Sequence, residues 1–289
     1  MTWSSAKECK KVLSNWAVDS LIQEAELTPK PGLVDPGDQG AHLDMSFAMM
    51  VKSAHSLRET FSQIAEVSYN RKPSQELREE IAEIGREGEK VMMEATKGVN
   101  THKGAIWVLG LLTSGTAVNK PGEAVPQIVE TASIISRYND RRAPLISSHG
   151  SEIHKKFGVK GARGEAVSGF PRIINVALPM LYQSRKKGIS EDYARLDTLV
   201  NLIACLDDTC IIHRGGLAVL YLIQEKAQQV LQCGGVSTSE GWSKLEELNQ
   251  TLLKHNASPG GSADLLAAVL YLDQLRNDQN IIEKKMATI

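Results

Sequence analysis

The sequence of 289 residues lacks long apolar runs, paired cysteines and an excess of either charge. Because no apolar run reaches the roughly 18 residues of a membrane-spanning helix, we expect no transmembrane segment. The charged N-terminus also lacks the apolar stretch of a secretory signal. The four cysteines show neither CxxC pairing nor zinc-ligand spacing, which favours reduced thiols in the cytoplasm. A net charge of −1 gives no general reason to bind nucleic acid or an anionic membrane, so any anion site must be local.

Patterns typical of β-strands are nearly absent as well, and aromatic residues make up only 5% of the chain. Helical periodicity extends through most of the sequence, and 42% hydrophobic residues suffice for a sizeable core. We therefore predict an all-α fold in which residues 1–289 form a single multi-helix domain. Helices are expected at residues 5–26, 44–68, 74–96, 104–117, 121–138, 171–187, 191–206, 215–232, 239–255 and 262–277.

Two segments, 105–112 and 265–272, are apolar nearly all round, which predicts central helices wrapped by amphipathic ones. A polar loop that contains glycine precedes each of them. The longest stretch without a helical pattern is 139–170, which is rich in Gly, Arg and His. It marks either a domain boundary or a functional loop, and we favour the functional loop because long ordered loops in compact domains are often functional.

The segment GVNTHKGAIW (98–107) places cations at the start of the first central helix. Asn100 or Thr101 is suited to capping this helix, but Lys103, and His102 if protonated, would be repelled by the helix dipole. In one interpretation, these two side chains simply point into water. In the other, a bound polyanion offsets the repulsion and uses the free backbone N–H groups of the helix start.

The segment LTPKPGLVDPGDQGAHLDM (27–45) contains three prolines and three glycines, which exclude regular structure. It is either a surface loop with solvated charges or part of a phosphate site. Asp44 is suited to capping a helix that begins near Met45, which would place His42 at a helix N-terminus. Lys30 and Asp35 lie on the same segment.

Four glycines surround Arg163 and Glu165 in GVKGARGEAVSGFP (158–171). An arginine here can grip a phosphate or carboxylate with two hydrogen bonds, or it can pair with Glu165 in an exposed loop. The nearby segment HGSEIHKKFG is not an HExxH zinc motif, and the chain has no GxSxG sequence. Hydrolysis through an enzyme nucleophile therefore has no positive support.

The segment LDDTCIIHRGG (206–216) carries the adjacent carboxylates Asp207 and Asp208, followed by His213 and Arg214. Two carboxylates beside a phosphate site suit Mg²⁺, which proteins usually hold with one or two carboxylates plus substrate phosphates. The alternative is that one aspartate caps a helix and the other is exposed.

The segment SPGGSADLLAAVLYL (258–272) leads into the second central helix. Gly260 and Gly261 allow a ligand to approach the backbone closely, and Ser262 is suited to capping the helix. Asp264 falls in the first helical turn, where the helix dipole favours a carboxylate, so a purely structural role is also open.

Taken together, five segments resemble, in sequence order, the motifs of the triphosphoribosyl-dephospho-CoA synthases, which serve citrate lyase and malonate decarboxylase. The matching segments are LTPKPGLVD…GAH.DM, GVNTHKGAI, GARGEA..GFP, DDT…HRGG and SPGGSADLLA. The resemblance spans about residues 24–268. It has two departures, Asp38 and Cys210, where the family pattern has asparagine. Both bear on substrate preference or rate.

The resemblance implies a transferase that moves the triphosphoribosyl group of ATP to the 2′-hydroxyl of 3′-dephospho-CoA and releases adenine. The product would be the precursor of a prosthetic group of an acyl-carrier subunit. A transition state resembling an oxocarbenium ion needs a carboxylate, for which Glu165 or Asp35 is expected, and a proton carrier, for which His102 or His213 is expected. The expected triphosphate clamp consists of Lys30, Lys103, Arg163 and Arg214, with Mg²⁺ on Asp207 and Asp208. Further contacts to ATP are expected from His42, Asn100, Thr101, Gly260, Gly261 and Ser262.

Two other functions remain open at this stage. One is a related transferase that moves the ribose of ATP to another acceptor, which Asp38 and Cys210 allow. The other is a non-catalytic helical module that binds nucleotides without turnover. Association into a homo-oligomer is also open, because no sequence pattern bears on it.

Overall fold

The computed structural model describes residues 3–143 and 149–286, and within these ranges the chain forms helices and no strands. The all-α prediction is therefore confirmed. In chain order the helices are α1 (Ala6–Glu26), α2 (Phe47–Ser56), α3 (Arg58–Ser68), α4 (Gln75–Ala95), α5 (Lys103–Val118), α6 (Val125–Arg137), α7 (His149–Phe157), α8 (Gly161–Val167), the π-helix η1 (Ile173–Ala177), α9 (Leu178–Lys186), α10 (Glu191–Cys205), α11 (Thr209–Gln232), α12 (Ser239–Lys254) and α13 (Gly260–Met286).

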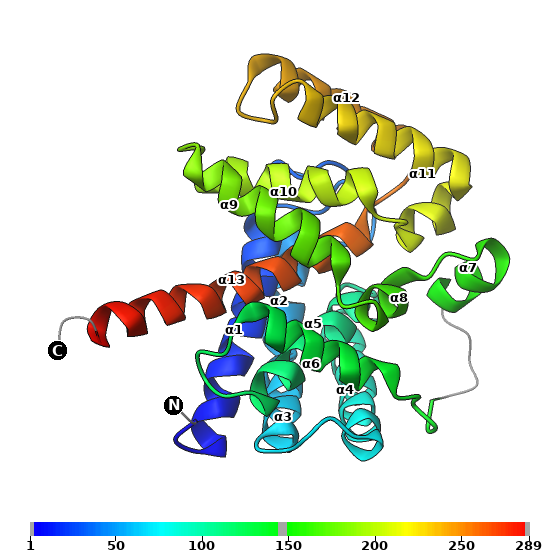
Figure 1. The fold of residues 1–289 in the computed structure, drawn as a ribbon. Helices are drawn as coiled ribbons and strands as arrows, with labels where there is room; N and C mark the ends of the chain where they lie inside the picture. Colours follow the sequence, from blue (N-terminus) through cyan, green and yellow to red (C-terminus); the bar gives the residue numbers. More distant parts are fainter. Residues whose placement is uncertain (1–2, 144–148, 287–289) are drawn as a thin grey trace.

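Helices α5 and α13 form the centre of the molecule, as their all-round apolarity predicts. Most of α5 between Ala105 and Ala117 is buried, and so is every residue of α13 from Leu265 to Leu272. The Tyr271 hydroxyl of α13 donates a hydrogen bond to Oγ1 of Thr116 in α5, at 3.2 Å. In Figure 1, α13 crosses the molecule between a lower group that contains α1 to α6 and an upper group that contains α9 to α12.

Several helix boundaries differ from the prediction. The helix expected at 44–68 is two helices, α2 and α3, which meet at Leu57. Helix α11 begins at Thr209 rather than 215, because the backbone stays helical up to Gly216, where φ is 76° and the helix bends. The segment 139–170 was expected to have no helical structure, which is wrong in part because it contains α7 and α8. Residues 144–148 of that segment lie outside the described residues.

The loop between α1 and α2 folds around the carboxylate of Asp35, which is buried. One Asp35 oxygen accepts hydrogen bonds from the backbone N–H groups of Gly37 and Asp38, at 2.7 and 2.9 Å, and the other accepts from Lys30 N–H at 2.8 Å. Gly40 has φ +57°, and a Cβ atom there would lie 2.6 Å from the backbone of Gly32. The prolines and glycines of this segment thus shape an ordered loop that packs against the core.

None of the helices formed by the described residues combines the length and the apolarity that a bilayer crossing requires.

Candidate active site

The N-termini of α11 and α13 are joined by the carboxylate of Asp208, which is 1% exposed. Oδ1 of Asp208 accepts hydrogen bonds from Cys210 N–H at 2.9 Å, which caps α11, and from Gly261 N–H at 3.3 Å. Oδ2 accepts from the N–H and the hydroxyl of Ser262, at 2.9 and 3.0 Å. One side chain therefore satisfies backbone donors that two helix starts would otherwise leave without partners.

The N-terminus of α5 meets that of α13 through Asp264, a residue in the first turn of α13. The backbone N–H of Ala105 donates a hydrogen bond to the Asp264 carboxyl group. A Cβ atom on Gly104 would lie 2.0 Å from Oδ2 of Asp264, so only glycine leaves room for this contact. The three helices that follow the motifs GVNTHKG, DDT and SPGG therefore start at one place, which we call the N-terminal junction.

The carboxyl group of Asp264 is the unusual group of this junction. Its side chain is partly exposed, while protein surrounds it closely on the other sides. Desolvation, followed by the nearby carboxylates of Asp208 and Glu24, raises its pKa well above the ordinary value. A carboxyl group whose pKa is raised, on a residue that solvent partly reaches, is a candidate acid–base catalyst.

His102 lies beside the junction and resolves part of the problem posed by the cations at the start of α5. It is 3% exposed, and burial, together with the charge of Lys30, lowers its pKa to about 3. The imidazole is therefore neutral and adds no positive charge to the helix dipole. Its Nδ1 is 2.8 Å from Oγ of Ser53, which lies 2.6 Å from Oγ1 of Thr101, whereas Nε2 is buried without a hydrogen-bond partner.

Lys103, the other cation at this helix start, points away to α4. Its Nζ lies 2.8 Å from Oε2 of Glu89, and both side chains are partly exposed. The Asn100 side chain accepts a hydrogen bond from Lys103 N–H at 3.2 Å, as the capping interpretation predicts. Two carboxyl groups thus lie near the positive end of α5. Glu89 pairs with the Lys103 side chain, and Asp264 accepts a hydrogen bond from Ala105 N–H.

Lys30 does not project into an open site, because it forms a buried ion pair. Its Nζ lies 2.6 Å from Oε1 of Glu24 and also donates to the Glu24 backbone carbonyl at 2.8 Å. The two side chains are 1% and 4% exposed. This pair fixes the start of the loop against α1, and its charges act on both His102 and Asp264.

His42 and Arg214 tie the same loop to α11 and to the approach of α13. Nε2 of His42 is 2.9 Å from the hydroxyl of Ser258, and Nδ1 is 3.3 Å from Arg214 NH2. Arg214 NH1 donates to the backbone carbonyls of Ala41 and Asn256, at 2.8 and 3.3 Å. Three of the five motifs are therefore held together by these two side chains.

The motif GARGEA forms α8 and lies beside the start of α11, where a Cβ atom on Gly161 would be 3.3 Å from Cγ2 of Thr209. The alternative of an Arg163–Glu165 pair is wrong. Glu165 is buried, and its carboxylate instead accepts two hydrogen bonds from Arg172, at 2.7 and 2.9 Å. Arg163 NH2 donates to Oδ1 of Asn139 at 2.8 Å.

The two carboxylates predicted to share Mg²⁺ have separate partners within the protein. The four hydrogen bonds to Asp208 occupy its carboxylate oxygens, and the Asp207 side chain is 51% exposed and lies 3.7 Å from Arg172 NH2. Among the side chains that the structure describes, no three His, Cys, Asp or Glu residues are arranged to hold a metal ion. A magnesium site on Asp207 and Asp208, which would also use substrate phosphates, stays a prediction.

The structure thus gathers some of the predicted site residues and separates others. At or beside the N-terminal junction lie Lys30, His42, Asn100, Thr101, His102, Lys103, Asp208, Arg214, Gly260, Gly261 and Ser262. Asp35 organises the loop that contacts the junction, whereas Glu165, Asp207 and Arg163 lie on the α8 side, with Arg172 between Glu165 and Asp207. His213 is exposed on α11.

The contacts of Asp264 and Glu24 at the junction were not predicted from the sequence. Asp264 was noted as a residue favoured by its own helix dipole, but its carboxyl group serves the neighbouring helix α5. Glu24 lies in a helix whose pattern gave no functional signal. Gly104 leaves room for the Asp264 carboxyl group, but the two residues are far apart in the sequence, so their contact could not be predicted from it.

The two departures from the family pattern lie in different surroundings. Cys210 is exposed at the junction, where a Cβ atom on Gly260 would be 3.1 Å from its Sγ. Asp38 is exposed on the loop, where its side chain accepts a hydrogen bond from Gly40 N–H at 2.6 Å. The position of Cys210 is therefore the one that bears on a ligand at the junction.

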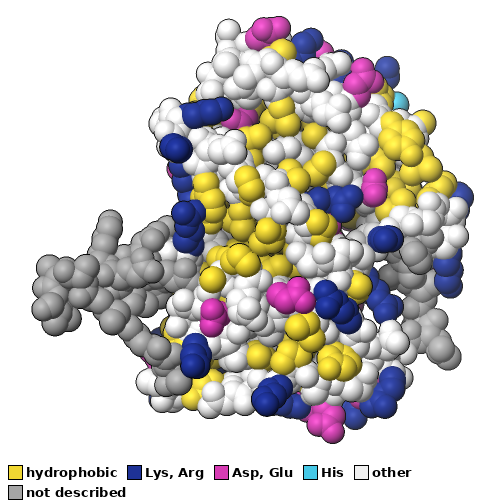
Figure 2. Space-filling view, viewed as in Figure 1, with side chains coloured by type: hydrophobic (Ala, Val, Ile, Leu, Met, Phe, Trp, Pro, Cys, Tyr) yellow, Lys and Arg dark blue, Asp and Glu magenta, His cyan; other side chains and the backbone are white. Residues whose placement is uncertain are grey.

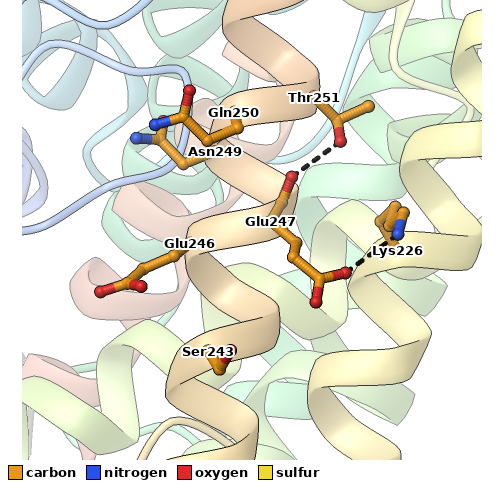
Figure 3. Close-up of a pocket in the computed structure, with 7 residues that line it drawn as sticks. All are labelled: Lys226, Ser243, Glu246, Glu247, Asn249, Gln250 and Thr251. Carbon is orange, nitrogen blue, oxygen red and sulfur yellow. Dashed lines mark hydrogen bonds and ion pairs between the residues drawn. The ribbon is translucent and has the colours of Figure 1, made fainter.

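A separate pocket lies between α11 and α12, and Figure 3 shows the side chains that line it. Two of its charged residues pair with each other, because Lys226 Nζ is 3.1 Å from Oε2 of Glu247. None of the predicted site residues lines this pocket. The N-terminal junction is therefore a better candidate for the active site than this pocket.

Comparison with known proteins agrees with the motifs. Residues 10–282 match the family described as ATP:dephospho-CoA triphosphoribosyl transferase. The chain belongs to this family. It is 47% identical over 264 residues to the 2-(5″-triphosphoribosyl)-3′-dephosphocoenzyme-A synthase of Klebsiella pneumoniae, covering 91% of this chain and 94% of that protein. It is 45% identical to a probable synthase of the same name from Pseudomonas syringae pv. tomato, covering 91% of each chain. No solved structure matches the chain significantly.

Replacing Asp264 with Asn should raise the free energy of unfolding of this protein, and by more at pH 8 than at pH 5. A carboxyl group whose pKa is raised on folding contributes stability below its unfolded pKa, about 3.9, and loses it as pH rises through the folded value. Asn keeps an acceptor for Ala105 N–H and does not titrate. Urea denaturation at the two pH values measures the free energy of unfolding. If the substitution changes the free energy of unfolding by the same amount at pH 5 and at pH 8, the raised pKa of Asp264 is contradicted.

Proposed function

We propose that this protein transfers the 5-triphosphoribosyl group of ATP to the 2′-hydroxyl of 3′-dephospho-CoA and releases adenine. The observation that carries the proposal is the family match over residues 10–282, a range that contains all three helix starts of the N-terminal junction. ATP and dephospho-CoA are the substrates named in the family description. The junction supports the proposal because it combines backbone N–H groups, glycines and a partly exposed aspartate whose pKa is raised.

The reaction sets three requirements for the site. A bond forms between the acceptor 2′-oxygen and C1″ of the ATP ribose, and the bond from C1″ to adenine breaks. The hydroxyl proton must leave, and adenine must gain a proton, while the triphosphate stays intact. Positive charge develops on the ribose in the transition state, as in glycoside cleavage. The site therefore needs a polyanion clamp, a proton carrier and a nearby carboxyl group.

Asp264 is the proposed proton carrier. Proton transfer is most efficient when the pKa of the catalytic group lies near the working pH, and the pKa of Asp264 is shifted upward. His102 is poorly matched to the same task because its pKa is lowered to about 3. The free Nε2 of His102 is suited instead to a hydrogen bond with a substrate.

Two other candidates from the sequence have structural contacts that limit a catalytic role. The oxygens of Asp35 accept three backbone hydrogen bonds, which shape the loop. The carboxylate of Glu165 is held by Arg172. Their proposed role is therefore to position the loop and α8 around the substrates.

Lys103 is the proposed first contact to the triphosphate. Its ion pair with Glu89 is partly exposed, and such a pair is worth about 0–1 kcal/mol, so a more highly charged phosphate group can replace Glu89 at little cost. Magnesium is expected to accompany ATP. Asp207, which is exposed, is the proposed contact to a magnesium ion carried by the triphosphate.

The purified protein should release adenine when it is incubated with ATP, Mg²⁺ and dephospho-CoA, and release should require both substrates. Separation of the products by liquid chromatography distinguishes adenine from ADP and AMP. Formation of ADP or AMP in place of adenine would contradict ribosyl transfer. Adenine released with another nucleotide acceptor but not with dephospho-CoA would contradict the proposed acceptor.

The variant Asp264→Asn should lower kcat for adenine release by about 10²- to 10⁴-fold, because it keeps the shape of the side chain and loses the transferable proton. Asp19→Asn is the matched control, since Asp19 is an exposed carboxylate on the surface of α1. It should leave kcat unchanged. A kcat of Asp264→Asn within threefold of the unsubstituted protein would remove Asp264 from proton transfer.

A further inference from the structure

Arg78 of α4 and Trp107 of α5 form a buried contact in which two hydrogen-bond donors have no acceptor. Cζ of Arg78 lies 4.8 Å from the centroid of the Trp107 ring, and Arg78 is 6% exposed. Nε of Arg78 and Nε1 of Trp107 are both buried without a partner. Both groups can only donate, and buried donors are nearly always paired in folded proteins. Two such donors side by side indicate a missing acceptor.

The carboxylates near Arg78 are already engaged with other arginines. Asp140 lies 2.5 Å from Arg86 NH1, and Glu79 lies 2.6 Å from Arg141 Nε. Arg142 NH1 adds a contact to Glu83 at 3.2 Å. No described carboxylate forms an ion pair with Arg78, although Asp140 and Glu79 lie near enough to act on its charge.

Further positive charge surrounds the same place. Desolvation lowers the pKa of Arg78, and the guanidinium groups of Arg163 and Arg86 add to the effect, against which Asp140 and Glu79 act. An arginine keeps its proton even so, which leaves a buried cation that an anion would stabilise. Figure 2 shows Lys and Arg side chains gathered on the lower right of this face, where Figure 1 places α4, α6 and α8.

This cluster adjoins the N-terminal junction. Trp107 follows Lys103 by four residues, so the two lie on the same face of α5, one turn apart. Arg163 lies in the first turn of α8, and the first residue of that helix, Gly161, contacts Thr209 at the start of α11. An extended polyanion at the junction would therefore reach the cluster.

We propose that Arg78, Trp107 and Arg163 form a phosphate subsite, in which Arg78 and the Trp107 indole N–H bind phosphoryl oxygens of a substrate. The inference rests on the proposed function, because that reaction brings two polyphosphates to the site, the triphosphate of ATP and the diphosphate of dephospho-CoA. Either provides the same chemistry. Arginine is suited to it because its planar donor group matches two phosphate oxygens at once.

The test measures binding of inorganic triphosphate and of pyrophosphate to the full chain by calorimetry, and the KM of each substrate. Arg78→Gln should weaken binding of at least one of the two anions by tenfold or more, and Arg78→Lys should weaken it less. Arg142→Gln removes an exposed arginine on the same face and should change binding less than twofold. A rise in the KM of ATP alone would assign the subsite to the triphosphate, and a rise for dephospho-CoA alone would assign it to the diphosphate.

Trp107→Phe keeps the ring under Arg78 and removes its N–H donor, so it tests the subsite even if Arg78→Gln fails to fold. It should weaken binding of the same anion several-fold. Unchanged anion binding and unchanged KM values in Trp107→Phe and in Arg78→Lys or Arg78→Gln would overturn the proposal. Because anion binding is measured without turnover, absence of adenine release with intact binding would instead contradict the proposed function.

Discussion

The structure depends on one carboxylate, that of Asp208, which holds the N-termini of α11 and α13 in contact. Its four hydrogen bonds come from Cys210 and from Gly261 and Ser262, which lie more than fifty positions further along the chain, and they place Gly260 against Cys210 and Gly261 against Asp208 itself. Once α13 is anchored there, Asp264 reaches the start of α5. The meeting of the three helix starts, and with it the candidate active site, follows from this contact.

The junction carries an electrostatic cost that a purely structural arrangement would avoid. Desolvation, followed by the nearby carboxylates of Asp208 and Glu24, raises the pKa of Asp264, while Lys30 is the cation paired with Glu24. Functional sites often reduce stability in this way, because a group with a shifted pKa is useful in catalysis. The guanidinium of Arg78 is a second costly group, because it is buried and forms no ion pair with a described carboxylate. A phosphate group bound beside it would balance its charge.

The sequence was sufficient to predict the helical fold, the two central helices and the segments that meet. It was insufficient for the charge pairs. Lys103 contacts Glu89 and Glu165 contacts Arg172, and no local spacing indicates either pair, because tertiary packing decides which exposed faces meet. Asp264 was misjudged for a related reason: the rule for the first helical turn concerns its own helix, whereas its carboxyl group serves α5. The helices α7 and α8 are short, so they left little periodicity to detect.

The central claim is that the substrate binds where the three helix starts meet. Amide hydrogen exchange with and without ATP tests it directly. Exchange should slow in peptides that cover 98–106, 206–214 and 256–265 together, and stay unchanged in α12, which lines the separate pocket of Figure 3. Protection confined to α12 and the adjoining part of α11, with none at the three helix starts, would contradict the account.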